Sequence, residues 1–456
     1  MTKRREFIRK SLIGSAGIAV GGIGLNASTY ASVKGANDRV NIAVVGIRGQ
    51  GGGHITRWCD LKDNRNVRLK TICDVDEQFF ADKVKTILEK TGVKAVTEWD
   101  MRRVFDDKEI DAVSFATPNH WHALGTIWAC QAGKNVYIEK PACHNIFEGR
   151  KMVDAARKYN VRVQTGFQNR SIAGVIEAIK FLHEGGIGDV FMAKGLCYKP
   201  RDSFGIAKDG TPPASLHYDM WLGPAPYRPY NEKRLHYNWH WFWDTGNGDT
   251  GNQGPHQFDI ARWGLNKNEH PVSVFSTGGI FGIDPAECEQ ETPNTQISLF
   301  KYQDGKILEF ETRGRYTNDE SSLGIRIGNL FYGTEGYLEI DGGNWKAFRQ
   351  REKEPFAGSG MEEKKVIDPT FLVAPGGTEH YANFIDAIRS GKNETLNCDI
   401  KEGYYSSALP IMANISYRLG RVLTFDGNRE KFVDDDQANQ MITRDYRKPY
   451  VVPSVV

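Results

Sequence analysis

The sequence predicts an α/β protein in two parts: an N-terminal doubly wound parallel sheet, and a C-terminal α+β part built on a large, mostly antiparallel open sheet. Two observations support this division. Up to residue 165, short apolar runs alternate with helix-like stretches, as parallel strands joined by crossover helices require. From residue 166 onward, longer strand-like runs of alternating character follow one another with few helices between them, which favours an antiparallel sheet.

The first part contains five expected strands, and helix-like stretches lie between them. The strands are expected over residues 40–45, 67–73, 112–116, 135–138 and 161–165, and the helices over residues 81–91, 120–132 and 147–158.

The second part begins with an expected helix over residues 172–184, and two late helices, over 380–390 and 402–419, are expected to pack back on the core. At 456 residues the chain is long enough for two domains, which we place over 38–165 and 166–430, followed by a C-terminal tail over 431–456. Strands of the second domain are expected over residues 189–198, 272–280, 296–302, 307–312 and 336–340.

Residues 1–31 resemble a twin-arginine export signal. Lys3, Arg4 and Arg5 precede a glycine-rich apolar stretch, and small residues end the segment near Ala31, where we expect cleavage. The apolar stretch is about 15 residues, short of the about 20 that a membrane-spanning helix needs, so a membrane anchor is only the alternative. We therefore expect a periplasmic or otherwise exported protein that has the twin-arginine export machinery as a partner. We expect no stable membrane insertion of the mature chain.

Charge and cysteine content exclude several classes of protein. The net charge is +2, and loss of a leader with five basic residues and one acidic residue changes it to about −2, which does not favour nucleic acid as a partner. The seven cysteines are scattered singly, without a C-x-x-C pair or metal-ligand spacing. We expect mostly buried thiols and no metal site, although one pair could still oxidise after export.

A glycine-rich loop follows the first expected strand. Gly46, Gly49 and Gly51 suit a tight turn in which the backbone approaches a pyrophosphate, with the phosphates facing amides at the start of the next helix. The spacing is G-x-x-G-x-G and not the usual G-x-G-x-x-G, so an ordinary glycine turn is the alternative. We expect these three glycines and Arg48, which lies between them, to contact a dinucleotide.

The second expected strand ends at an acid, Asp74. A carboxylate at this place accepts hydrogen bonds from the adenosine ribose hydroxyls and repels a 2′-phosphate, and no arginine follows it to bind that phosphate. The sequence therefore favours NAD over NADP. A loop acid or a helix cap is the alternative interpretation of Asp74.

Three further segments, residues 117–122, 139–141 and 164–170, follow expected strands at their carboxyl ends, where the crevice of such a sheet binds ligands. We expect cofactor contacts from them. The residues concerned are Asn119, Trp121, His122, Glu139, Lys140 and Asn169.

These segments, in this order, resemble the Gfo/Idh/MocA oxidoreductases, which are sugar-acting dehydrogenases with an N-terminal Rossmann domain and a C-terminal open sheet. The resemblance covers roughly residues 38–430. It implies that Lys140 lies beside nicotinamide and substrate, and that a non-trans peptide bond precedes Pro141. A lysine partly desolvated near a cationic ring would have a lowered pKa and could exchange a proton with a sugar hydroxyl; a surface lysine is the alternative.

The second part supplies a candidate catalytic histidine, His256. Pro255 suits a first helical turn, and His256, Asp259 and Trp263 then share one helix face. The resemblance implies an acid four residues before this histidine, but Asn252 stands there and cannot share a proton. His256 could act alone, with Lys140 or with an acid elsewhere, and Asp259 could simply brace the helix.

An aromatic and histidine-rich run over residues 236–244 precedes this helix. Indole faces can stack on a pyranose while polar tips bind its hydroxyls, although buried packing or an oligomer interface explains the same composition. The expected substrate contacts are Tyr198, His217, Tyr237, Trp239, His240, Asn252 and His256.

The leading hypothesis is an exported NAD-dependent oxidoreductase that acts on a sugar or glycoside by hydride transfer at a secondary alcohol. The rival is a hydrolase, since the sequence also resembles the NAD-dependent glycosidases that include α-N-acetylgalactosaminidases; a non-catalytic sugar- or nucleotide-binding protein is the third hypothesis. Export away from free NAD implies a cofactor loaded before export and held tightly. An open sheet with one exposed face also favours a homo-oligomer.

Overall fold

The computed structural model describes residues 38–315, 317–359 and 377–456. Val40–Val456 form one compact unit, which contains every feature described below. The expected export signal over residues 1–31 lies outside the described residues.

Six parallel strands form the first sheet, in the order β3-β2-β1-β4-β5-β6. The order reverses at β1, which lies between β2 and β4, so a crevice is expected at the carboxyl ends of these strands. The strands are β1 (Val40–Val45), β2 (Val67–Cys73), β3 (Val96–Glu98), β4 (Ala112–Phe115), β5 (Asn135–Ile138) and β6 (Val163–Thr165).

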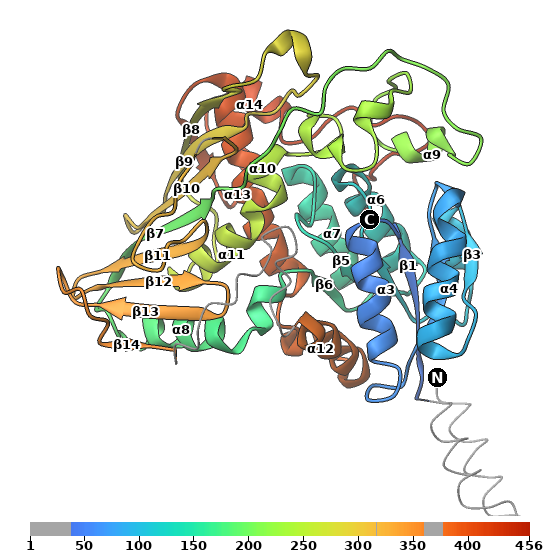
Figure 1. Cartoon of the computed structure of the whole chain (residues 1–456), viewed down its shortest axis with the longest axis horizontal. Helices are drawn as coiled ribbons and strands as arrows, with labels where there is room; N and C mark the ends of the chain where they lie inside the picture. The colour runs from blue at the N-terminus through green and yellow to red at the C-terminus, as the bar shows by residue number, and fades with distance from the viewer. Residues whose placement is uncertain (1–37, 316, 360–376) are drawn as a thin grey trace, which may run out of the picture. The chain divides into compact units, whose positions relative to one another are not determined.

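Helices cover both faces of this sheet because its strands are apolar on both sides. In β1, Ile42 and Val44 belong to one buried cluster, and Ala43 and Val45 belong to the other. Figure 1 shows α12 beside α3, although the two are far apart in sequence. One face carries α3 (Gln50–Asp60), α4 (Phe80–Thr91) and α12 (Gly377–Ser390), and the other carries α5 (Met101–Asp106), α6 (Asn119–Gln131) and α7 (Ile146–Lys158).

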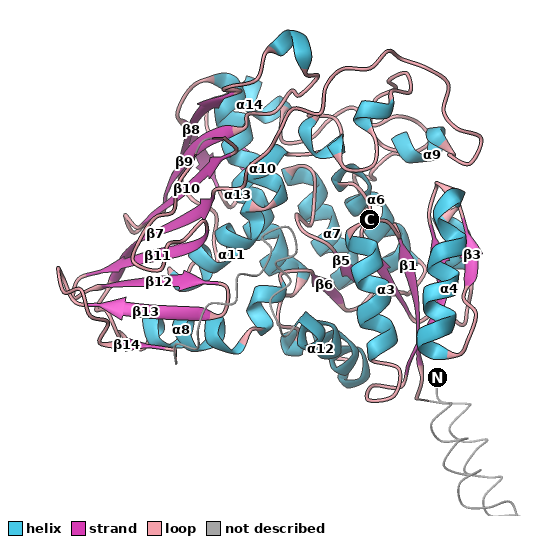
Figure 2. Ribbon diagram, viewed as in Figure 1, coloured by secondary structure: helices cyan, strands magenta, loops and turns pink. Residues whose placement is uncertain are grey.

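Ten strands of the described chain form the second sheet, in the order β14-β13-β12-β11-β7-β10-β9-β8-β15-β16. The pair β7 and β10 is parallel, and the other pairs are antiparallel, as Figure 2 lets the reader follow. The predicted fold class is thus confirmed. The strands are β7 (Val190–Cys197), β8 (Ser273–Gly279), β9 (Thr295–Lys301), β10 (Ile307–Arg313), β11 (Ile327–Gly333), β12 (Tyr337–Asp341), β13 (Asn344–Phe348), β14 (Ala357–Gly358), β15 (Leu423–Asp426) and β16 (Lys431–Phe432).

One face of the second sheet packs against helices and the other face is partly exposed. Outward-facing Phe275, Ile297 and Leu299 are 36%, 40% and 42% exposed. The α-helices of this part are α8 (Ala173–His183), α9 (Tyr218–Leu222), α10 (Gly248–Asn252), α11 (Gly254–Gly264), α13 (Ile400–Leu419) and α14 (Asp436–Gln440), and the short 3-10 turns include η1 (Glu77–Phe79), η2 (Gln168–Ser171) and η4 (Asn238–Trp241).

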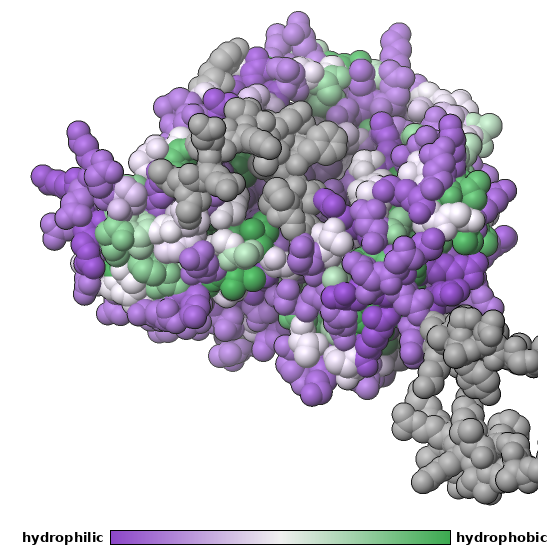
Figure 3. Space-filling model, turned by 60° about the horizontal axis from the view of Figure 1, so that its bottom comes forward, coloured by the Kyte–Doolittle hydropathy of each residue, from purple (hydrophilic) through white to green (hydrophobic). Residues whose placement is uncertain are grey.

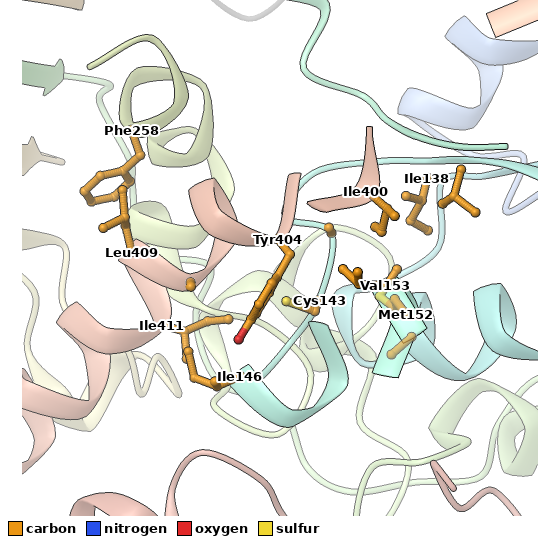
Figure 4. Packing of buried hydrophobic residues seen from close by; sticks show 14 of the residues in the cluster. Ile138, Cys143, Ile146, Met152, Val153, Phe258, Ile400, Tyr404, Leu409 and Ile411 are labelled. Carbon is orange, nitrogen blue, oxygen red and sulfur yellow. The ribbon is translucent and has the colours of Figure 1, made fainter. Parts of the chain in front are cut away.

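The long helix α13 joins the two halves of the core. Its Tyr404 packs against Cys143 and α7, while Leu409 lies near Phe258 of α11, as Figure 4 shows. A side chain at Gly149 would collide with the Tyr404 ring, since an added Cβ would lie 2.2 Å from it. Close packing of α7 on α13 therefore fixes the second sheet's helices against the first sheet.

A long segment between β7 and α10 crosses from the second part to the first. We call residues 199–247 the cap segment. It is bound to the end of β2 by two backbone hydrogen bonds, from Glu77 N to Ser215 O (2.9 Å) and from His217 N to Val75 O (2.8 Å). The C-terminal tail also contacts the cap segment: Arg447 Nε donates a hydrogen bond to Gly223 O (3.0 Å).

The seven cysteines are free and buried, which confirms the expectation of buried thiols. Within the described ranges, none of the helices combines the length and the apolar character that a bilayer crossing requires. Figure 3 shows one face of the molecule on which hydrophilic residues surround smaller hydrophobic groups.

Candidate active site

A cavity of about 940 Å³ lies at the carboxyl ends of the parallel strands and is lined by both parts of the chain. Asp74 follows β2 at one end of the cavity, and Lys140 follows β5 toward the other. Because β1 and β4 lie between these two strands, the cavity crosses the point at which the strand order reverses.

The glycine loop forms the floor of this cavity at the start of α3. Gly46 has φ 79° and an added Cβ would lie 2.7 Å from Ala116 O; at Gly51 it would lie 1.8 Å from Gly46 O. Gly49 precedes α3 with φ 47° and has open space where a Cβ would be. The first turn of α3 has no acidic residue, so the positive end of this helix suits an anion such as a pyrophosphate.

Asp74 is held by two backbone amides. Its Oδ2 accepts a hydrogen bond from Ile47 N (2.8 Å) and its Oδ1 accepts one from Asp76 N (3.0 Å). Burial raises the pKa of Asp74 to about 6. The carboxylate is therefore oriented by the turn, and its remaining lone pairs are available to ligand hydroxyls.

Two buried polar atoms in the cavity lining point to a polar ligand. Thr117 Oγ1 and Asn119 Nδ2 have no hydrogen-bond partner among the residues that the structure describes. Buried polar groups in native proteins are normally paired, so these atoms are consistent with a ligand that bonds to them. Together with the open glycine turn, they fit a dinucleotide.

Glu139 is the most heavily bonded carboxylate of the site. Its Oε1 accepts hydrogen bonds from Gln168 Nε2 (2.9 Å), His54 Nε2 (3.0 Å) and Gln50 Nε2 (3.2 Å), and its Oε2 accepts one from the backbone of Lys140 (3.2 Å). Burial alone would raise its pKa, but the hydrogen bond from His54 and the charge of Lys140 hold the pKa of Glu139 well below its usual range. Glu139 is therefore ionised at neutral pH.

Lys140 lies between the two parts of the chain. The peptide bond to Pro141 is cis, as the resemblance implied. The Lys140 Nζ donates to the backbone carbonyl of Asn252 at 2.9 Å. Burial lowers the pKa of Lys140, and the Glu139 carboxylate acts in the opposite direction. This is the direction that the sequence predicts, and it makes Lys140 better suited to accept a proton than an exposed lysine.

His256 lies in the first turn of α11, after Pro255, with its ring edge toward Phe167. Burial and the charge of Lys140 lower the pKa of His256 to about 3, so the imidazole is neutral at physiological pH. Its Nδ1 has no hydrogen-bond partner within the described part of the chain, although the residue lines the cavity. His256 is thus placed to accept or donate one hydrogen bond to a ligand.

Asp259 does not contact His256 but braces the helix. Its two carboxylate oxygens accept hydrogen bonds from Arg170 at 2.8 and 2.9 Å, and Ser406 Oγ donates at 2.6 Å. The side chain is fully buried, and Arg170 holds the pKa of Asp259 below its usual range despite the opposing effect of burial. The structural alternative proposed for Asp259 matches this geometry.

The aromatic run forms the cavity wall near Lys140. Tyr237, Trp239 and His240 line the cavity, and the rings of Trp239 and His240 stack with centroids 3.6 Å apart. Arg201 Nη1 donates to the Tyr237 hydroxyl (2.9 Å), and Arg201 Nη2 donates to Asp249 Oδ1 (2.9 Å). These contacts fix aromatic faces and polar tips in the cavity wall close to Lys140 and Asn252.

The cavity brings together most of the predicted site residues. Those that line it are Gly46, Arg48, Gly49, Asp74, Asn119, Trp121, His122, Glu139, Lys140, Tyr237, Trp239, His240, Asn252 and His256.

Four predicted residues, Gly51, Asn169, Tyr198 and His217, lie outside the lining. Gly51 packs directly beneath Gly46 O. Tyr198 is buried, and its hydroxyl lies within hydrogen-bond distance of two carboxylates, those of Glu311 (2.9 Å) and Glu320 (2.6 Å), away from the cavity lining. His217 does not line the cavity as expected: its ring stacks on Trp99, which lines the cavity together with Asp74.

Several residues of the site had no sequence signal. His54 and Ser114 lie within ordinary helix and strand patterns, and Trp99 follows the short strand β3, which was not predicted. Gln168 lies in a segment that was singled out, but its bond to Glu139 depends on a turn that the sequence does not specify. Tertiary proximity alone identifies these residues.

A doubly wound sheet, a glycine turn at its reversal point, an acid after β2 and a buried lysine in the same cavity define a dinucleotide-binding α/β protein of the dehydrogenase class. Residues 40–167 match the family described as "Oxidoreductase family, NAD-binding Rossmann fold", and residues 205–331 and 365–452 match "Oxidoreductase family, C-terminal alpha/beta domain". The chain belongs to the Gfo/Idh/MocA oxidoreductase family.

Relatives in this family include both oxidoreductases and hydrolases by name. A levoglucosan dehydrogenase of Pseudarthrobacter phenanthrenivorans is 38% identical over 96 residues, which are 21% of this chain and 25% of that protein. A glycosyl hydrolase family 109 protein of Shewanella pealeana is 26% identical over 171 residues, 34% of this chain and 37% of that protein. The matched regions therefore span only a quarter to somewhat over a third of these relatives.

Solved structures match over a much larger part of the chain. Levoglucosan dehydrogenase in complex with NADH and levoglucosan has a TM-score of 0.64 at 18% identity, covering 85% of this chain and 99% of that one. An aldose-aldose oxidoreductase from Caulobacter crescentus complexed with glycerol has a TM-score of 0.61 at 18% identity, covering 85% and 100%. At these identities the matches show the shared fold.

Proposed function

We propose that the protein is an NAD-dependent oxidoreductase that acts on a secondary alcohol of a sugar or glycoside. One observation carries the proposal: a single cavity contains the glycine turn and Asp74 at one end and Lys140 with His256 at the other. Nucleotide-binding and proton-exchanging groups therefore share one continuous space, as alcohol oxidation requires.

The residues at the Asp74 end would hold the dinucleotide. The amides at the start of α3 would bind the pyrophosphate, and Asp74 would accept hydrogen bonds from the adenosine ribose. A 2′-phosphate would be repelled by Asp74 and by Asp76, which also lines the cavity, so NAD is favoured over NADP. When bound, NAD supplies the acceptor for the hydride that alcohol oxidation releases.

Lys140 and His256 would manage the proton of the substrate hydroxyl. A neutral Lys140 Nζ can accept this proton, and the neutral imidazole of His256 can accept it or hold the hydroxyl in place. The aromatic wall of Tyr237, Trp239 and His240 would bind the apolar face of the sugar ring.

The cap segment supports a cofactor that is retained between turnovers. Its Leu216, His236 and Trp239 line the same cavity as Asp74, and its Ser215 hydroxyl donates to Asp76 Oδ1 at 2.9 Å. Release of a nucleotide would require these contacts to open. Retention suits the export signal expected at residues 1–31, because an exported enzyme has no access to free cytoplasmic NAD. We therefore propose loading before export through the twin-arginine machinery and a periplasmic or otherwise exported location.

A redox-neutral glycosidase is the second candidate, favoured by the relatives named as glycosyl hydrolase family 109 proteins. In that reaction the sugar is oxidised transiently at carbon 3, the aglycone leaves by elimination, water adds and the ketone is reduced again. A retained cofactor would suffice, because no net oxidation occurs.

One experiment separates these functions. Protein is purified from the exported fraction and denatured, and its nucleotide is identified by mass spectrometry; we expect NAD. Native protein is then incubated with a panel of sugars and an artificial electron acceptor, and separately with nitrophenyl glycosides without an acceptor. Formation of a keto-sugar that depends on the acceptor supports the oxidoreductase. Nitrophenol release without an acceptor supports the glycosidase, and protein that functions without any nucleotide contradicts both.

The exposed face of the second sheet supports a homo-oligomer. Phe275, Ile297 and Leu299 lie on that face in adjacent strands β8 and β9. A second copy that covers them would remove apolar surface from water. Sedimentation at micromolar concentration tests this proposal, with a monomer as the contradicting result.

A further inference from the structure

His54 of helix α3 is joined by hydrogen bonds to strand β4 and to the end of strand β5. The His54 ring is fully buried. Nδ1 lies 2.8 Å from Ser114 Oγ of β4, and Nε2 lies 3.0 Å from Glu139 Oε1 at the end of β5. Both ring nitrogens are satisfied when the Ser114 hydroxyl donates to Nδ1 and Nε2–H donates to Glu139.

The surroundings of His54 keep its ring in one orientation. Tyr137 and Tyr381 contact it edge-on, with ring centroids 5.4 and 5.5 Å away. The carboxylate that it bonds is equally confined, since Gly166 leaves no room for a side chain: an added Cβ there would lie 2.8 Å from Glu139 Oε1. The bond between His54 and Glu139 is therefore fixed by packing on both sides.

Glu139 and Lys140 are neighbours in sequence, yet their side chains bond to different partners. The carboxylate of Glu139 bonds to His54, Gln50 and Gln168, whereas the Nζ of Lys140 donates to Asn252 O. The carboxylate still acts on Lys140 through its charge, because it raises the pKa of Lys140 against the effect of burial. A change in the position or charge of Glu139 would thus reach Lys140 without any direct side-chain bond.

We propose that His54 is a positioning residue of the active site, which holds the Glu139 carboxylate in a fixed orientation and charge state behind Lys140. This inference rests on the proposed function only for the role of Lys140 in proton exchange. The other charged or titratable groups that act on this pair come from several elements: His256 and His380 near Glu139, and Tyr237, Lys199 and Arg201 near Lys140. His54 differs from these groups because it bonds the carboxylate directly.

The test measures the proton affinity of Lys140 and needs neither substrate nor turnover. Full-length protein is labelled with trace acetic anhydride between pH 6 and 11, and the acetylation of each lysine is quantified by mass spectrometry. The pH at half-maximal labelling of Lys140 is the readout, and Lys85, whose side chain is 75% exposed, is the internal control. Failure of the proposed function leaves this measurement unaffected.

Two substitutions at the same position separate the two ring nitrogens. The amide nitrogen of Gln stands as many bonds from Cα as Nε2, so His54→Gln retains a donor toward Glu139; that of Asn corresponds to Nδ1, so His54→Asn loses the donor. We expect His54→Asn and Glu139→Gln to lower the labelling midpoint of Lys140 by about half a pH unit or more, because the carboxylate no longer stabilises the ammonium. His54→Gln is expected to keep the native midpoint.

A native midpoint in His54→Asn, or equal shifts in the Asn and Gln variants, would overturn the proposal. If His54→Asn does not fold, as judged by thermal unfolding, Glu139→Gln and His54→Gln are compared directly. A shift in the first variant without one in the second supports the proposal, and equal midpoints in the two variants contradict it.

Discussion

Lys140 Nζ and the backbone carbonyl of Asn252 are 2.9 Å apart, and this hydrogen bond joins the end of β5 to α10. The side chain at position 252 points elsewhere, since its Nδ2 donates to the Tyr237 hydroxyl at 3.4 Å. The lysine is therefore held by the backbone of the second part of the chain. An acid at position 252 is not required to orient Lys140.

Replacement of Lys140 by alanine tests its chemical role. We expect Lys140→Ala to lower turnover by about 100-fold or more, because a group that exchanges a proton in the transition state is lost. The nucleotide is expected to remain bound, since the glycine turn and Asp74 are unchanged. Steady-state kinetics and the nucleotide content after denaturation check the two outcomes; full turnover would contradict the assignment.

Restoration of an acid at position 252 is expected to change the pH dependence of turnover. A carboxylate in Asn252→Asp would lie near Lys140 and stabilise its ammonium form, which raises its pKa. If neutral Lys140 accepts the proton, the rise of turnover with pH then moves to higher pH, by about half to one unit. The pH profile of kcat measures this shift. Asn266→Asp adds the same charge at an exposed turn and should leave the profile as it is.

NAD affinity is expected to depend on the charge of Asp74. Burial raises its pKa to about 6, so the carboxylate is ionised above that pH and protonated below it. If the ionised form binds the ribose, affinity is constant above about pH 7 and falls below pH 6, approaching tenfold per pH unit. NADH fluorescence titrations from pH 5 to 8 check this. Asp74→Asn should bind more weakly and lose the pH dependence; an unchanged slope would exclude Asp74 as its source.

Much of the fold was predictable because the spacing of apolar residues along the sequence indicates which side chains are buried. The strands 40–45, 67–73 and 135–138 were predicted with the observed ends, since most residues of each strand are buried. The strand β3 was not predicted, because Val96–Glu98 is a short edge strand with exposed side chains. Local pattern therefore identifies buried elements better than edges.

The site residues that follow parallel strands could be placed from the sequence. Those that lie in long loops could not. Asp74, Asn119 and Lys140 follow parallel strands, whose carboxyl ends lie at one edge of the sheet. His217 belongs to the cap segment, whose path depends on long-range contacts such as its stacking on Trp99. Its sequence neighbours gave no indication of that path, so the sequence could not show that His217 lies outside the cavity lining.

The cap segment is expected to slow nucleotide release. His217 Nε2 lies 2.7 Å from Glu77 Oε1, and its ring stacks on Trp99 with centroids 4.0 Å apart. His217→Ala removes both contacts, and we expect the rate of NAD release to rise by about threefold to tenfold, consistent with a loss of about 1 kcal/mol. Displacement of bound NADH in a stopped-flow fluorimeter measures the rate. His183→Ala, which alters an exposed histidine bonded to Trp263 O, is the matched control, and equal rates in both variants would contradict a role for the cap segment.

The ion pair between Arg170 and Asp259 is expected to stabilise the fold and not to perform chemistry. Both side chains are buried, so Asp259→Asn leaves the Arg170 charge without its partner and should lower the free energy of unfolding by about 3–5 kcal/mol. The folded-state pKa of Asp259 is below its unfolded value, so its contribution is present above about pH 4 and is lost as the pH falls further. Urea denaturation of the native protein and the variant at pH 7 measures the difference. The folded fraction of Asp259→Asn should keep the native pH profile of turnover, because His256 does not bond to Asp259. A large loss of turnover with unchanged stability would instead make Asp259 a partner of the catalytic histidine.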